Sequence, residues 1–179
     1  MKKLVAIAVA ILLFASACNW RYVQTVGNSP MRWTCGPIAY KINPYNSNSW
    51  QHQQIMTDMG QLGAKMNRVV YFAGFTNETL RGNGPARGFI LFEYYWPSDA
   101  PSGYGWTRRT IQGNYYIGAN TYLNAPAIIH SNIVKHEAGH TVGLDHVSDP
   151  QEIMDPTRAW QNSDWGPGTS FGLSELGKC

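Results

Sequence analysis

The sequence predicts a single α/β domain in which strands and helices alternate and the last third is rich in loops. Residues 38–42 alternate apolar and polar side chains, which is the pattern of a half-buried strand. An apolar stripe with helical spacing follows, and then several short apolar runs bounded by glycine or proline. With 179 residues, 44% hydrophobic and 14% charged, the chain is typical of one globular domain and unlike collagen, coiled-coil or disordered chains.

The first helix and most of the strands are each predicted by a separate pattern in the sequence. Asn43-Pro44 ends the strand at 38–42. Apolar residues then recur every three or four positions and predict an amphipathic helix that begins near Ser49, the candidate N-cap. These residues are Ile55, Met59, Leu62, Met66 and Val69. Four further strands are expected at 69–72, 89–95, 107–112 and 115–119.

A second helix is expected to begin at Pro126, because proline is favoured in the first turn of a helix. Before it, Gly113-Asn114 separates the last two strands and is typical of a hairpin turn. After Gly143 the chain consists mostly of loops, with a short helical stretch at 173–177.

Residues 1–17 have the layout of a secretory signal, with two lysines before an apolar run and small residues at its end. The run is shorter than the roughly 20 residues that cross a membrane. Without residues 1–17, which hold two of the 14 basic side chains, 162 residues remain with 12 basic and 11 acidic side chains, a net charge of +1. This charge does not support a nucleic-acid partner. We expect residues 18–32 to be a tether and 33–179 to form the domain.

The chain has three cysteines, Cys18, Cys35 and Cys179. Cys18 directly follows Ala15-Ser16-Ala17, which is either a signal-peptidase site or similar to a bacterial lipobox that leaves Cys18 acylated. The lipoprotein hypothesis uses the odd cysteine and leaves Cys35 and Cys179 as a disulfide pair. We therefore expect an exported protein, either a cell-envelope lipoprotein anchored to the membrane through lipidated Cys18 or a free secreted or periplasmic protein.

The second helix carries a candidate metal site, His136-Glu137-Ala138-Gly139-His140. Residues four apart lie on one face of a helix, so His136 and His140 can reach a single zinc ion. Glu137 lies beside them, where a carboxylate can take a proton from zinc-bound water.

His146 is the candidate third ligand. It lies ten residues after His136, so a continued helix would carry it about 15 Å along the axis and out of reach. Gly143 stands where a positive φ lets the chain turn back. Three histidines would then fill three of four tetrahedral positions and leave one for water, which is the arrangement of a catalytic zinc.

Segment 136–146 follows the pattern H-E-x-x-H-x-x-G-x-x-H and resembles the metzincin zinc endopeptidases. Metzincins also carry a methionine turn beneath the metal, and Met154 lies eight residues after His146. Within the metzincins the chain resembles the matrixin branch, as seen in small bacterial secreted members. The resemblance rests on the short gap between His146 and Met154, the Met-x-Pro turn, the closing residues 172–177 and the first domain residues 33–40.

The resemblance implies a metzincin-like catalytic domain: a twisted mixed sheet with an antiparallel edge strand, two main helices, a zinc cleft and a short C-terminal helix. One catalytic zinc ion would be held by His136, His140 and His146, with Glu137 as the catalytic residue. The implied function is a zinc-dependent endopeptidase that hydrolyses proteins or peptides through zinc-bound water activated by Glu137. The substrate would lie along an edge strand near 104–112.

The resemblance also places the S1′ wall after Met154, with Trp160 and Trp165 as candidates. The partner is expected to be a protein or peptide substrate, and the chain a monomer. Two other hypotheses remain open. One is an envelope-anchored binding protein with a vestigial zinc site, and the other is a gluzincin-type peptidase with Glu152 as third ligand.

Several residues have simpler interpretations. His52 and His130 are expected to be surface or capping histidines. Arg108-Arg109 on a strand is typical of solvated side chains, one on each face. Cys35 superficially resembles the zinc-ligating propeptide cysteine of latent matrixins, but a strand follows it directly, so the disulfide is favoured.

Overall fold

The chain is described by a computed structural model that places residues 22, 25–26, 29–77 and 86–178. The predicted signal at 1–17 lies outside these residues, as do Cys18 and Cys179. Because Cys179 is not described, the disulfide between Cys35 and Cys179 stays a prediction. Cys35 itself is exposed. None of the helices in the described part of the chain is long and apolar enough to cross a membrane.

A six-stranded mixed sheet forms the base of the fold, in agreement with the predicted α/β class. Its strands are β3 (Arg32–Trp33), β4 (Ile38–Ile42), β5 (Val70–Phe75), β6 (Ile90–Glu93), β7 (Gly105–Gln112) and β8 (Tyr115–Leu123). The order is β3-β8-β6-β4-β5 with parallel neighbours, and β7 pairs with β8 in the antiparallel direction. A separate pair consists of β1 (Thr25–Val26) and β2 (Ser29–Pro30).

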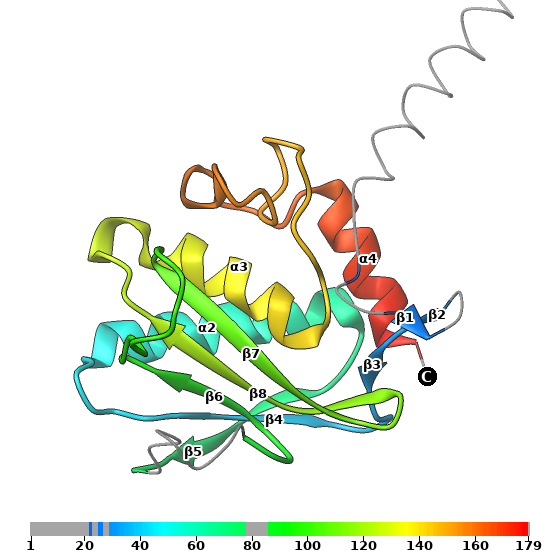
Figure 1. Cartoon of the computed structure of the whole chain (residues 1–179), viewed down its shortest axis with the longest axis horizontal. Helices are drawn as coiled ribbons and strands as arrows, with labels where there is room; N and C mark the ends of the chain where they lie inside the picture. The colour runs from blue at the N-terminus through cyan, green and yellow to red at the C-terminus, as the bar shows by residue number, and fades with distance from the viewer. Residues whose placement is uncertain (1–21, 23–24, 27–28, 78–85, 179) are drawn as a thin grey trace, which may run out of the picture.

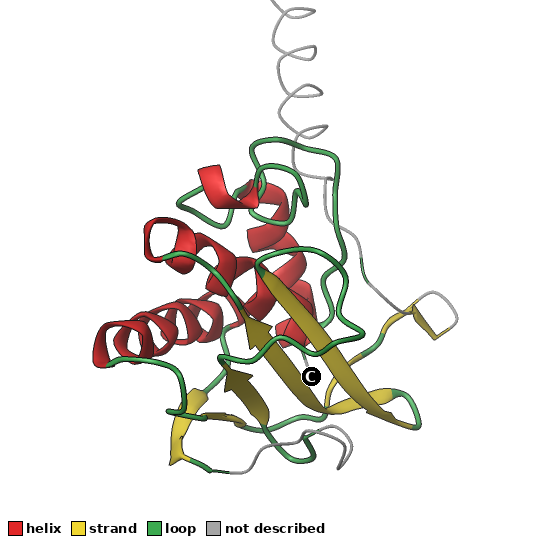
Figure 2. Cartoon of the chain, turned by 60° about the vertical axis from the view of Figure 1, so that its left-hand side comes forward, coloured by secondary structure: helices red, strands yellow, loops and turns green. Residues whose placement is uncertain are grey.

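Three α-helices occur in the described residues, and two of them cover one face of the sheet (Figures 1 and 2). The helices are α2 (Ser49–Met66), α3 (His130–Val142) and α4 (Pro167–Gly177). Short 3₁₀ turns are η1 (Ala127–Ile129) and η2 (Ala159–Gln161). Helix α2 packs against α3 and α4, so the three helices and the sheet share one core.

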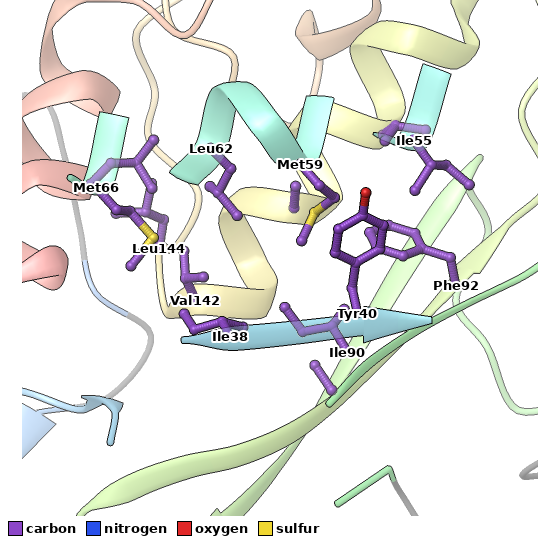
Figure 3. Close-up of a cluster of buried hydrophobic side chains, with 14 of the residues drawn as sticks. Ile38, Tyr40, Ile55, Met59, Leu62, Met66, Ile90, Phe92, Val142 and Leu144 are labelled. Carbon is purple, nitrogen blue, oxygen red and sulfur yellow. The ribbon is translucent and has the colours of Figure 1, made fainter. Parts of the chain in front are cut away.

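The core lies between β4, β6 and the helices (Figure 3). Along β4, Ile38, Tyr40 and Ile42 are buried and alternate with partly exposed residues, as the sequence pattern predicts. Four of the five residues in the predicted helical stripe are buried on α2. Val69 is the exception and is 63% exposed, because α2 ends at Met66 and its C-cap, Asn67, adopts a left-handed conformation.

Several predicted boundaries are displaced. Helix α2 is capped by Asn48 and not Ser49, through a capping box with Gln51. Helix α4 extends over Pro167–Gly177 and not only the last five residues. Part of the expected tether belongs to the domain, since Met31 is buried and β3 pairs with β8.

Candidate metal centre

Helix α3 places the candidate site above the sheet. Pro126 precedes the 3₁₀ turn η1, and α3 follows it directly. The helix ends at Gly143, which has φ 115° and donates its N–H to the carbonyls of Gly139 and His140. The positive φ turns the chain back at the predicted position and brings His146 towards the helix.

The turn brings three imidazoles together. The Nε2 atoms of His136, His140 and His146 lie 3.0–3.1 Å from one another. Among the His, Cys, Asp and Glu side chains in the described part of the chain, these three histidines form the group that could hold a metal ion. An ion about 2.0–2.1 Å from each nitrogen can sit against all three, so the donor set fits a zinc ion.

Backbone carbonyls fix the orientation of two rings. His136 Nδ1 lies 2.7 Å from the Ile153 carbonyl oxygen, and His140 Nδ1 lies 2.8 Å from that of Leu144. A carbonyl only accepts hydrogen bonds, so each Nδ1 carries the proton and each Nε2 presents its lone pair to the shared centre. Outer contacts of this kind are what orient metal-binding histidines.

Burial keeps these imidazoles neutral. It lowers the pKa of His136 to about 4 and the pKa of His140 well below its usual value. The pKa of His146 is lowered for the same reason, against the opposing charges of Asp145 and Asp155. All three rings are therefore in the metal-binding form near neutral pH.

Glu137 is also buried and lines the same cleft. Its Oε2 accepts a hydrogen bond from Thr107 Oγ1 at 2.7 Å. Burial raises its pKa to about 7, while the Thr107 hydrogen bond and the charge of Arg109 act in the opposite direction. A carboxyl with that pKa can accept and release a proton near neutral pH.

Met154 supports the helix from below. Its side chain is buried, and a Cβ added to Gly139 would lie 2.6 Å from the Met154 sulfur. The glycine therefore allows the methionine to approach α3 between two of the histidines. The Met154 carbonyl accepts the Val147 N–H at 3.1 Å, which ties this turn to the segment after His146.

Glu152 lies away from the three imidazoles. It is fully buried, and its carboxylate oxygens accept the backbone N–H groups of Gly168 and Thr169 at 2.7 and 2.8 Å. Both groups belong to the first turn of α4, where a carboxylate is favourable. The gluzincin-type hypothesis, with Glu152 as third ligand, is therefore wrong.

The three histidines line a cleft of about 580 Å³. Its lining includes apolar residues, Ile133 of α3 and Pro156, Ala159 and Trp160 of the later loops. Asn132 Nδ2 donates to the Trp160 carbonyl at 2.8 Å, which fixes η2 beside the first half of α3. Strand β7 lines the same cleft with Gly105, Trp106, Thr107 and Arg109.

The structure corrects two predictions about aromatic and histidine residues. Trp160 lines the cleft, but Trp165 is 1% exposed and belongs to the core. His130 is also buried and not a surface residue. It stacks on Tyr94, hydrogen-bonds to the Tyr94 hydroxyl and contacts the Trp50 ring. His52 is partly exposed and hydrogen-bonds to Ser47 Oγ at 2.7 Å.

Strand β7 contributes three site residues that were not predicted as such from the sequence, and one of them, Arg109, was expected to be a solvated side chain instead. Thr107 contacts Glu137, Gly105 packs against its carboxylate, and Arg109 Nη1 donates to the His140 carbonyl at 2.8 Å. They share one face because they are two positions apart on a strand. That spacing is visible in the sequence, but which face meets the helix depends on how β7 pairs with β8.

No protein-family model matches the chain, and no curated protein matches it. Solved structures do. One is high choriolytic enzyme 1, a hatching-enzyme zinc protease from Oryzias latipes (medaka), with 18% identity, a TM-score of 0.42 and coverage of 70% of this chain. Another is metalloproteinase-II from Bacteroides fragilis, with 12% identity, a TM-score of 0.46 and coverage of 87% of this chain. The matches span 55% and 56% of those two chains, little more than half of each.

Proposed function

We propose that the chain is a zinc-dependent endopeptidase of the metzincin type, similar to small bacterial matrixins. The observation that carries this proposal is the convergence of the His136, His140 and His146 Nε2 atoms to 3.0–3.1 Å in a cleft that also contains Glu137. The long motif across 136–146 supports the same function.

The three histidines would hold one zinc ion. No fourth His, Cys, Asp or Glu joins them in the described residues, whereas structural zinc sites have four protein ligands. A bound zinc ion supplies a Lewis acid that polarises a peptide carbonyl and lowers the pKa of a coordinated water to about 7.

Glu137 would serve as the general base and then as the general acid. Its buried carboxyl accepts a proton from the attacking water and delivers it to the departing amine. The raised pKa, about 7, suits both steps, because the group gains and loses the proton at a similar cost. Thr107 donates a hydrogen bond to the carboxylate and Arg109 adds a nearby positive charge, so the ionised form is present to act as the base.

The substrate would be an extended segment of a protein or peptide. Strand β7 lines the cleft, and β8 is its strand partner in the described part of the chain. Its other backbone edge can pair with a peptide by β-augmentation. The apolar part of the cleft lining, with Ile133 and Trp160, would accept an apolar substrate side chain.

We also propose that the protein works outside the cytoplasm as a monomer, either anchored through lipidated Cys18 or free. The signal-like layout of residues 1–17 supports export, and the small residues before Cys18 support the anchored form.

A peptide-library digest tests the proposed function. We expect the purified chain to contain about one zinc per molecule and to cleave internal peptide bonds. A hydroxamate chelator should stop cleavage, and added zinc should restore it after dialysis. His140→Ala should lose both zinc and cleavage. Peptide binding without cleavage by the zinc-loaded wild-type chain would instead indicate a binding protein with a vestigial site.

A further inference from the structure

We propose that Thr107 is a positioning residue for Glu137, and that β7 thereby aligns both the catalytic carboxylate and the substrate. This inference rests on the proposed peptidase function. It assigns to Thr107 a role that the histidine motif does not include, because Thr107 lies 30 residues away from Glu137 in the sequence.

The contact is short and buried. Thr107 Oγ1 lies 2.7 Å from Glu137 Oε2, and the two residues are 8% and 4% exposed. An ionised carboxylate only accepts hydrogen bonds, so the Thr107 hydroxyl is the donor. A hydrogen bond to a charged group in a buried site is stronger than one between neutral groups.

A second hydroxyl supports the first. Thr121 Oγ1 lies 3.1 Å from Thr107 Oγ1, and Thr121 is fully buried. The two threonines face each other in the β7–β8 ladder, so strand pairing fixes their separation. Because the single Thr107 proton points to Glu137, the Thr121 hydroxyl donates to Thr107. The chain of donors therefore runs from Thr121 through Thr107 to Glu137.

The other side of the carboxylate is confined by Gly105. A Cβ added at this glycine would lie 2.5 Å from both Cγ and Oε1 of Glu137. The carboxylate thus lies against the backbone of β7 at one residue and is held by a hydroxyl of the same strand two residues later. It has little freedom to rotate away from β7.

This arrangement has a functional consequence. A peptide paired with β7 takes its register from the β7 backbone, and Glu137 takes its position from the same strand. Glu137 is therefore aligned relative to the bound peptide, and not only to helix α3. Loss of alignment should slow the chemical step and leave substrate binding unchanged, because the pairing edge is the β7 backbone, which a change of the Thr107 side chain leaves in place.

Kinetics of three variants test the proposal. In Thr107→Val, which keeps the side-chain shape, we expect kcat to fall about 10- to 100-fold with KM and zinc content unchanged. Thr107→Ser should restore most of kcat, because it restores the hydroxyl. Thr110→Val is the matched control, since Thr110 is a buried β7 residue whose hydroxyl donates to the Ala86 carbonyl. An equal fall of kcat in Thr107→Val and Thr110→Val, or a rise of KM alone, would overturn the positioning role.

A double-mutant cycle provides a readout that does not depend on activity. We expect Thr107→Val to lower the folding equilibrium constant by about tenfold or more when Glu137 is present, and by much less in the Glu137→Met background. Equal effects in both backgrounds would overturn the contact. If the wild-type chain cleaves no peptide, the proposed function fails, while this cycle still decides whether Thr107 holds Glu137.

Discussion

Two glycines of the site matter because a side chain at either position would collide with a neighbouring residue. At Gly105 a side chain would occupy the space of the Glu137 carboxylate, and at Gly139 it would collide with the Met154 sulfur. Neither glycine has the positive φ that would require glycine for backbone reasons. Both are therefore explained by close approach and not by a turn.

Gly105→Ala should lower peptidase activity. The added Cβ would overlap Glu137 Cγ and Oε1, so the carboxylate must move or β7 must shift. We expect kcat to fall about tenfold or more, since small displacements of a catalytic group cost much of the rate. Gly103→Ala is the control, because its nearest contact would be the Gly105 carbonyl oxygen at 3.7 Å. Equal kcat values for the two variants, measured on one fluorogenic peptide, would contradict the steric explanation.

His130 makes stability depend on pH. Burial lowers its pKa to about 4, so the folded state excludes the proton that the unfolded chain binds near its usual pKa of 6.5. Stability is therefore lost as pH falls from about 6.5 to about 4. The expected loss is about 3 kcal/mol over that range.

Chemical unfolding of the wild type and His130→Phe at several pH values checks this expectation. The variant removes the titrating ring, and its difference from the wild type cancels the other ionisable groups. We expect the wild type to lose stability relative to the variant as pH falls. Parallel curves for the two proteins between pH 6.5 and 4 would rule out the assigned pKa.

At the scale of elements, helix α4 depends on a residue far from it in sequence. Its N-cap position is Gly166, which has no side chain to bind the free N–H groups. Glu152 supplies both acceptors, at Gly168 and Thr169. The carbonyl of the next residue, Ile153, accepts a hydrogen bond from His136 Nδ1, so this segment connects α4 to the candidate metal centre.

Glu152→Ala should destabilise the fold without removing a metal ligand. Two buried N–H groups would lose charged acceptors, and we expect the free energy of unfolding to fall by about 3 kcal/mol. The folded variant should still bind zinc, whereas His146→Ala should not. Glu175→Ala is the control, because its pairing with Lys178 is at the surface and contributes little. Zinc loss in folded Glu152→Ala equal to that in His146→Ala would restore Glu152 as a ligand candidate.

For the molecule as a whole, local patterns in the sequence predicted the elements that carry the site. The alternation at 38–42, the spacing of three histidines and the break at Gly143 all correspond to observed structure. These features are local, because each depends on residues that lie within about ten positions of one another in the sequence.

Features that depend on distant contacts were not predictable. Strand β8 continues to Leu123, four residues beyond the expected end. Its last six residues are all buried, so the alternation of apolar and polar side chains that predicts a strand is missing there. Tyr94 covers His130, and the core encloses Trp165. Thr107 could not be assigned to Glu137, since the face that β7 turns to α3 is set by its pairing with β8.

The central claim is that the three-histidine centre hydrolyses peptides with Glu137 as the proton-transferring residue. The most direct test compares the wild type with Glu137→Gln at equal, measured zinc content on one fluorogenic peptide. We expect the variant to bind zinc normally and to cleave about 100-fold or more slowly. Cleavage by zinc-loaded Glu137→Gln at the wild-type rate would contradict the claim.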